Sequence, residues 1–95
     1  MDSIITGVEA ASIREVAAEH GATRIRIFGS LARGTAKPDS DLDLLVDLQP
    51  GRDLLDLIAI KQDLEQRLGR RVDVVTERSL SPYLRDQVLK EAVAI

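Results

Sequence analysis

Apolar side chains recur along residues 54–68 every three or four positions, which is the spacing of one stripe on an α-helix. The stripe consists of Leu54, Leu57, Ile58, Ile60, Leu64 and Leu68. Asp53 precedes this stripe as a typical N-cap, and Gly69 follows it as a typical C-terminal stop. We therefore expect a helix over residues 54–68, and it is the clearest helical pattern in the chain.

A second helix is expected near the N-terminus. Val8, Ile13 and Val16 recur there at helical spacing. Ser12 and Glu15 match the capping-box pattern, which predicts that the regular part of this helix begins late.

A third helix is expected to begin at Pro82. Ser81 before it is a typical N-cap, and proline is favoured at the first helical position. We expect Tyr83 in its first turn to pack against the protein. The apolar side of this helix consists of Leu84, Val88, Leu89, Ala92 and Val93.

Three short segments alternate between apolar and polar residues and predict strands. They are residues 24–28 (RIRIF), 41–48 (DLDLLVDL) and 71–76 (RVDVVT). In the second segment Leu42, Leu44 and Val46 fall on one face and the acidic positions on the other. Residues 30–34 predict a short helical turn. The alternation of helices and strands predicts an α/β fold with two or more layers, in one domain over residues 1–95.

Composition narrows the classes of function. The chain has 95 residues, no cysteine and a net charge of −3. A long nucleic acid is not expected as a partner, because phosphate neutralisation needs a basic face, although a single nucleotide is compatible with this charge. Disulfides and thiolate zinc sites are excluded. No apolar run is long enough to span a bilayer and the N-terminus lacks a secretory pattern, so we expect a cytoplasmic protein without a membrane partner.

Asp41 and Asp43 are candidate metal ligands. They lie two positions apart in one strand, so their side chains share a face, with the Cα atoms about 7 Å apart. Like charges this close repel, and a divalent cation such as Mg²⁺, which prefers carboxylate oxygens, would offset the repulsion. Asp73 would join them if its strand lies alongside, and three carboxylates can hold two metal ions. For each acid taken alone, the alternative is a solvent-facing strand position.

The turn before these acids is a candidate phosphate site. Gly29 has no side chain, so a phosphate could approach the backbone closely. Ser30 opens the short helix and offers its hydroxyl as a donor. Arg33, one turn later, could add positive charge, and a structural salt bridge is the alternative. The pair Gly-Ser alone also fits a tight strand-to-helix turn without a ligand.

The segments GSLARG, SDLDLLV and VDVV together resemble the nucleotidyltransferase superfamily of the DNA polymerase β type. The chain length and the C-terminal segment SPYLRDQVLKEAVAI resemble its minimal nucleotidyltransferases, known as MNT proteins. The resemblance covers residues 23–95, and the glycine, the serine and the three acids of the family pattern are all present. It implies the polymerase β-like fold, a small mixed sheet flanked by helices.

The resemblance also implies a role for each motif position. Asp41 and Asp43 would bind Mg²⁺ and so hold ATP. Asp73 would complete a second metal site and help to activate the attacking hydroxyl. Gly29 and Ser30 would contact the β- and γ-phosphates.

The function implied by the resemblance is that of an antitoxin. Minimal nucleotidyltransferases of this kind pair with a small helical HEPN protein, often a ribonuclease toxin, and some transfer AMP from ATP to a tyrosine on it. The expected function is therefore Mg²⁺-dependent protein adenylylation of a HEPN partner. The alternative is a binding module that masks the partner by contact alone. Transfer to a small molecule or an RNA end is less favoured, because the chain shows neither an acceptor domain nor basic charge.

Overall fold

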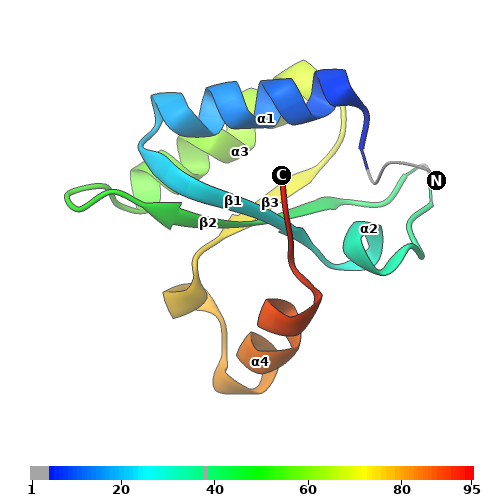
Figure 1. The fold of residues 1–95 in the computed structure, drawn as a ribbon. Coiled ribbons are helices and arrows are strands. Elements are labelled where there is room, and N and C mark those ends of the chain that lie inside the picture. The colour runs from blue at the N-terminus through cyan, green and yellow to red at the C-terminus, as the bar shows by residue number, and fades with distance from the viewer. Residues whose placement is uncertain (1–4, 38) are drawn as a thin grey trace.

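The computed structural model describes residues 5–37 and 39–95 and shows a four-stranded sheet with helices on both faces (Figure 1). In chain order the elements are α1 (Gly7–Glu19), β1 (Ala22–Phe28), α2 (Ser30–Arg33), β2 (Leu42–Leu48), α3 (Leu54–Leu68), β3 (Val72–Val75), the 3₁₀ turn η1 (Glu77–Ser79), α4 (Pro82–Glu91) and β4 (Val93–Ala94). The strand order is β3-β2-β1-β4. Strand β1 is antiparallel to β2 and β4, whereas β3 is parallel to β2. The expected small mixed sheet is confirmed.

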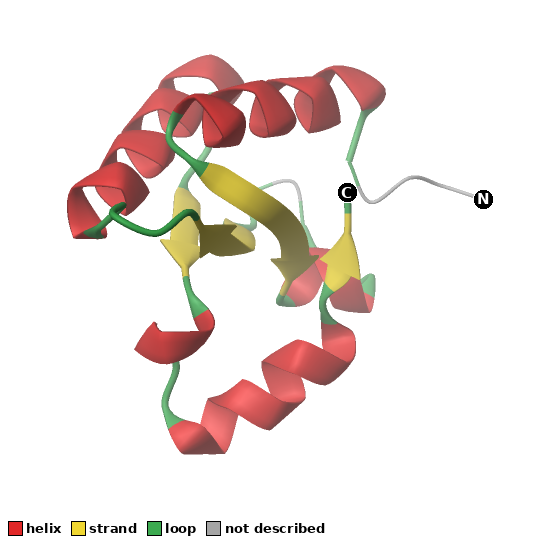
Figure 2. Ribbon diagram, turned by 60° about the vertical axis from the view of Figure 1, so that its left-hand side comes forward, coloured by secondary structure: helices red, strands yellow, loops and turns green. Residues whose placement is uncertain are grey.

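Helices α1 and α3 pack together on one face of the sheet, and η1 and α4 lie on the other (Figures 1 and 2). The core lies between the sheet and the pair α1 and α3, and it is aliphatic. Its fully buried members are Ile13, Val16, Ile27, Leu42, Leu44, Val46, Ile60, Leu64 and Val72. The alternation predicted for residues 42–46 is therefore confirmed, because the leucines and the valine on its apolar face are all in this core.

The helix ends agree with the sequence where the capping signal is unambiguous. Helix α3 has the predicted bounds, with Asp53 as N-cap and Gly69 in the left-handed conformation at its end. Helix α1 begins earlier than expected, because Thr6 and Glu9 form its capping box. The capping box expected from Ser12 was wrong, since that residue lies within the second turn of the helix.

The strands differ from the expected ranges by one or two residues. Strand β1 begins at Ala22, β2 at Leu42 and β3 at Val72, so Asp41 lies one residue before its strand. The two-residue strand β4 was not expected, and residues 92–93 were assigned to a helical side instead. The helix ends earlier because the backbone of Ala92 is extended and leads into pairing with β1.

Several side chains assigned to apolar faces are exposed to solvent, and they include Val8, Leu54, Ile58, Tyr83, Leu84 and Val93. Leu54 lies at the start of α3 beyond the edge of the core, and Ile58 is only partly covered. Tyr83 is 94% exposed, so the expectation that it packs was wrong. The first turn of α4 stands away from the sheet (Figure 2), and only Val88 of this helix is buried. A search of the described helices for a segment long and apolar enough to cross a membrane finds none.

Candidate active site

Two of the three candidate carboxylates lie directly opposite one another. The register of the parallel pair β2 and β3 places Asp43 against Asp73. Leu42 and Leu44 point into the core, so the side chain of Asp43 points to the opposite face, toward α4. The juxtaposition that the sequence required of these two strands is therefore present.

Asp41 lies in the loop before β2, near this pair, but its side chain is turned toward the guanidinium of Arg71. Its Oδ1 lies 3.3 Å from Nε of Arg71, whose side chain is 81% exposed. Within residues 5–37 and 39–95, the three aspartates do not bring one oxygen each to within 4.8 Å of one another. Convergence on one ion therefore needs a rotation of the Asp41 side chain, and its exposed partner leaves room for this.

The carboxyl of Asp43 has a raised pKa. Burial is the largest cause, and together with the negative charges of Asp73 and Asp41 it raises the pKa of the Asp43 carboxyl to about 6. The positive charge of Arg33 acts in the opposite direction. A carboxyl held among other carboxyls in this way gains from a cation, and hard oxygen donors are the ligands that Mg²⁺ takes. The residues present therefore fit a Mg²⁺ site.

Gly29 is in contact with Asp43, which gives a reason for the glycine that the sequence did not reveal. Its φ of +78° is a conformation that other residues adopt only with strain. A Cβ at this position would overlap Oδ2 of Asp43. The absence of a side chain at Gly29 therefore allows the turn and the Asp43 carboxylate to pack against each other.

Ser30 and Arg33 occupy the first and last positions of α2, directly after this turn. Ser30 is partly buried, and Arg33 is about half exposed. Nη1 of Arg33 lies 3.1 Å from Oε2 and 3.2 Å from Oε1 of Glu91. The salt bridge that the sequence left as an alternative for Arg33 is therefore present, although it engages only one nitrogen of the guanidinium.

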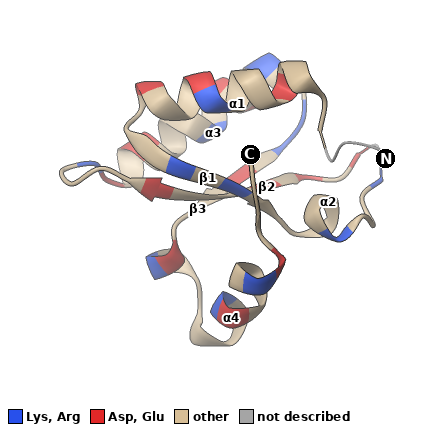
Figure 3. Ribbon diagram, in the orientation of Figure 1, with Lys and Arg blue, Asp and Glu red and all other residues tan. Residues whose placement is uncertain are grey.

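Two features of the sheet face near α4 were missed by sequence reasoning. Arg26 is only 7% exposed, and its Nη2 lies 3.2 Å from Oε1 of Glu77 and 3.7 Å from Oδ1 of Asp47. Figure 3 shows basic positions on β1 beside acidic positions on β2. Glu91 accepts a hydrogen bond from the amide of Gly29 at 3.0 Å. Neither feature has a local sequence signal, because the contacts join residues that are 21, 51 and 62 positions apart.

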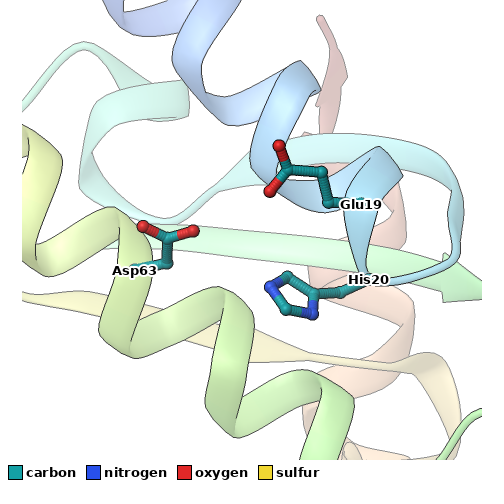
Figure 4. Close-up of side chains that lie close together, drawn as sticks. All are labelled: Glu19, His20 and Asp63. Carbon is teal, nitrogen blue, oxygen red and sulfur yellow. The ribbon is translucent and has the colours of Figure 1, made fainter.

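A second group of possible metal ligands lies on the opposite side of the sheet. Glu19 and His20 at the end of α1 and Asp63 of α3 point toward one another, with one ligand atom each within 4.8 Å (Figure 4). Asp63 already accepts a hydrogen bond from Nε of Arg67 at 3.2 Å. His20 is the C-cap of α1, and this helix-end position is the structural one that its sequence context favours. We assign no site to this group.

A pocket of about 650 Å³ lies at the carboxyl end of β2, away from the three aspartates. Its lining runs from Val46 to Leu54 and includes Thr76 and Glu77. The candidate acids lie at the opposite, amino end of β2 and β3, so this pocket does not belong to the same site.

The nucleotidyltransferase class is defined by this combination of features: a mixed sheet, an acid pair at one strand, a third acid on the parallel neighbouring strand and a glycine turn packed against the acids. The family model described as a nucleotidyltransferase domain matches residues 11–95. The chain therefore belongs to the nucleotidyltransferase domain family and is a nucleotidyltransferase.

Similar proteins agree with this assignment. The protein adenylyltransferase MntA of Thermococcus cleftensis is 40% identical over 95 residues, which is 100% of this chain and 92% of the relative. A solved structure provisionally described as a minimal nucleotidyltransferase is 53% identical, with a TM-score of 0.79 over 93% of this chain and 89% of the other. A crystal structure of a toxin-antitoxin with AMP-PNP is 28% identical, with a TM-score of 0.76 over 88% of this chain and 69% of the other.

Proposed function

We propose that this protein is a Mg²⁺-dependent protein adenylyltransferase that acts as the antitoxin of a HEPN toxin in the cytoplasm. The single observation that carries the chemistry is the pairing of Asp43 with Asp73 beside Gly29. The choice of a protein substrate is supported by the relative named protein adenylyltransferase MntA and by the toxin-antitoxin neighbour with AMP-PNP. The HEPN class of the partner rests on the resemblance to minimal nucleotidyltransferases.

In the proposed reaction a hydroxyl of the partner attacks the α-phosphorus of ATP. A new oxygen–phosphorus bond forms, and the bond between the α-phosphorus and the oxygen that bridges it to the β-phosphate breaks. Pyrophosphate leaves with the electrons of that bond, and the hydroxyl proton passes to solvent. We assign the attacking hydroxyl to a tyrosine of the partner. Mg²⁺, as one or two ions, would supply charge neutralisation at the reacting phosphate oxygens.

The residues of this chain bind and orient the reactants. Asp41, Asp43 and Asp73 are assigned as the metal ligands, and Asp73 as the acid beside the attacking hydroxyl. Ser30 and Arg33 are assigned to the phosphates, since both lie directly after the turn that touches Asp43. The amide of Gly29 is engaged by Glu91, so the contribution of Gly29 is chiefly to permit the close approach of Asp43. All six positions lie in the single domain that we propose for residues 1–95.

The experiment that tests this function compares the wild-type protein with the double variant Asp41→Asn, Asp43→Asn in complex with the partner. The complex is incubated with ATP labelled at the α-phosphate and Mg²⁺, and label on the partner and ribonuclease activity of the partner are both measured. We expect the wild-type protein to transfer label to the partner and to suppress the ribonuclease activity of the partner. We expect the double variant to transfer no label and to give no lasting suppression of that activity. A double variant that neutralises the partner without label would instead establish masking by contact, and equal labelling by both proteins would refute the assignment of the acids.

A further inference from the structure

Glu91 at the end of α4 is bonded to two parts of the nucleotide site. Its Oε1 accepts a hydrogen bond from the amide of Gly29 at 3.0 Å. Both of its oxygens accept from Nη1 of Arg33, at 3.1 and 3.2 Å. The Glu91 side chain is only 16% exposed, so this carboxylate is well shielded from solvent. Charge-assisted hydrogen bonds in such a setting are among the stronger polar contacts in proteins.

The position of Glu91 is set by the sheet and not by the helix alone. In the antiparallel pair β1 and β4, Ile27 lies opposite Val93 and Arg26 opposite Ala94. Glu91 lies two residues before Val93, and Gly29 lies two residues after Ile27. The short strand β4 therefore brings the end of α4 to the turn (Figure 1), 62 positions earlier in the chain.

Within residues 5–37 and 39–95, the side-chain hydrogen bonds of Arg33 come from Nη1 alone. A guanidinium has five N–H donors in a rigid planar fork. Only Nη1 is engaged by Glu91, and the Arg33 side chain is 47% exposed. A carboxylate that fixes one edge of the fork leaves the other edge to a second anion, so Glu91 orients Arg33 without blocking it.

We propose that Glu91 is a positioning residue of the nucleotide site, which acts through Arg33 on the triphosphate of the bound nucleotide. This inference rests on the proposed function, because it assumes that a nucleoside triphosphate binds beside Arg33. Glu91 does not touch the reacting atoms. It holds the guanidinium and the amide of Gly29 in one arrangement before the nucleotide arrives, which reduces the ordering that binding requires.

Two other roles for Glu91 make different predictions. A carboxylate that competes with phosphate for Arg33 would weaken nucleotide binding in the wild type, so its neutralisation would tighten binding. A carboxylate that only braces α4 against the sheet would affect thermal stability and leave the affinity for nucleotide unchanged. The positioning role predicts weaker binding.

The test is a double-mutant cycle on Glu91 and Arg33, measured by calorimetric titration with Mg²⁺ and an ATP analogue that has a methylene group between the α- and β-phosphates. Glu91→Gln keeps the shape of the side chain and an acceptor for the Gly29 amide but removes the charge. Asp86→Asn removes the same charge from an exposed position of the same helix and is the matched control. Thermal unfolding of every variant is recorded alongside.

We expect Glu91→Gln to raise the Kd for the analogue by about threefold to tenfold, which is in the lower part of the range of coupling between residues in contact. In the background of Arg33→Gln the same change should have no further effect, because the residue through which it acts is gone. With the partner and ATP, KM for ATP should rise while kcat stays within about twofold. Glu91→Asp, which keeps the charge, serves as a second variant and should bind more tightly than Glu91→Gln.

Unchanged or tighter binding of the analogue by a folded Glu91→Gln protein would overturn the proposal. An equal loss of affinity on Glu91→Gln in the presence and absence of Arg33 would overturn it as well. If Glu91→Gln does not fold, Glu91→Asp is compared with wild type instead, both with Arg33 present and in the Arg33→Gln background. The proposal is overturned if the two proteins have equal Kd values in both backgrounds and equal KM values for ATP. If the wild-type protein itself binds no nucleotide, the proposed function fails first, and the two failures are thereby distinguished.

Discussion

Replacing Asp43 by asparagine should stabilise the metal-free protein while abolishing its activity. The pKa of this carboxyl rises from 3.8 to about 6 in the folded chain. A shift of this size corresponds to about 3 kcal/mol if solvent screening is ignored. Asp43 is only half buried, so we discount the figure to about 1 kcal/mol.

The sign of the effect follows from proton binding. Because the pKa is raised by folding, the folded protein holds this proton more tightly than the unfolded chain does between pH 4 and about 6. Stability of the wild type therefore falls as the pH rises through this window, and the loss is complete above it. The asparagine side chain resembles the protonated acid and carries no charge at any pH, so the variant avoids the loss. The stability gain of Asp43→Asn should be present at pH 8 and vanish near pH 4.

The assay is thermal unfolding in EDTA at pH 4 and pH 8. A gain of about 1 kcal/mol corresponds to a rise in Tm of about 4–8 °C for a domain of this size. Asp86→Asn, on the exposed face of α4, is the control and should change Tm little at either pH. Added Mg²⁺ should raise the Tm of the wild type and leave that of Asp43→Asn unchanged, because only the wild type binds the ion. A lower Tm for Asp43→Asn at pH 8 in EDTA, or a difference from wild type that does not depend on pH, would refute this reasoning.

Two further predictions concern the packing around the site. Gly29→Ala and Gly34→Ala both place a side chain at a positive φ, +78° and +76°, so each should lower the free energy of unfolding by about 1 kcal/mol. The two variants differ in that only the methyl group at position 29 would overlap Asp43. Gly29→Ala alone should therefore abolish Mg²⁺-dependent nucleotide binding in calorimetry, and equal binding by the two variants would contradict the contact. Glu77→Gln should lower stability in urea unfolding by about 1–2 kcal/mol, because it removes the negative charge nearest to the buried Arg26. Among the described residues, the carboxylate that then remains beside Arg26 is that of Asp47, at 3.7 Å. A change below the error of the measurement would show that this ion pair contributes no net stability.

The parts of the fold that the sequence predicted well are those with local signals. Helix α3 has an apolar stripe, an N-cap at Asp53 and a glycine stop at Gly69, and all three signals agree on its bounds. Helix α1 has two possible capping boxes, and the one at Thr6 forms instead of the one at Ser12. Periodicity does not tell which edge of an apolar stripe is covered, so the exposure of Leu54 could not be predicted.

The sequence named the residues of the candidate site but did not reveal most of the contacts between them. The pairing of Asp43 with Asp73 could be anticipated, because a shared metal site requires adjacent strands. The contacts of Glu91 with Gly29 and Arg33 could not, because they depend on β4, a strand of two residues formed only by pairing with β1. Strand pairing of this kind joins distant segments and has no signature in local propensity.

The central claim is that this chain transfers AMP from ATP to a protein, and intact-protein mass spectrometry tests it most directly. The protein is isolated together with the partner that copurifies from its own cells, and the complex is incubated with ATP and Mg²⁺, or with ATP and EDTA. We expect the partner to gain the mass of one AMP unit per step in Mg²⁺ only, and the Asp41→Asn, Asp43→Asn variant to give no gain. A partner that stays bound and unmodified in Mg²⁺ and ATP would contradict the account and identify the protein as a masking module.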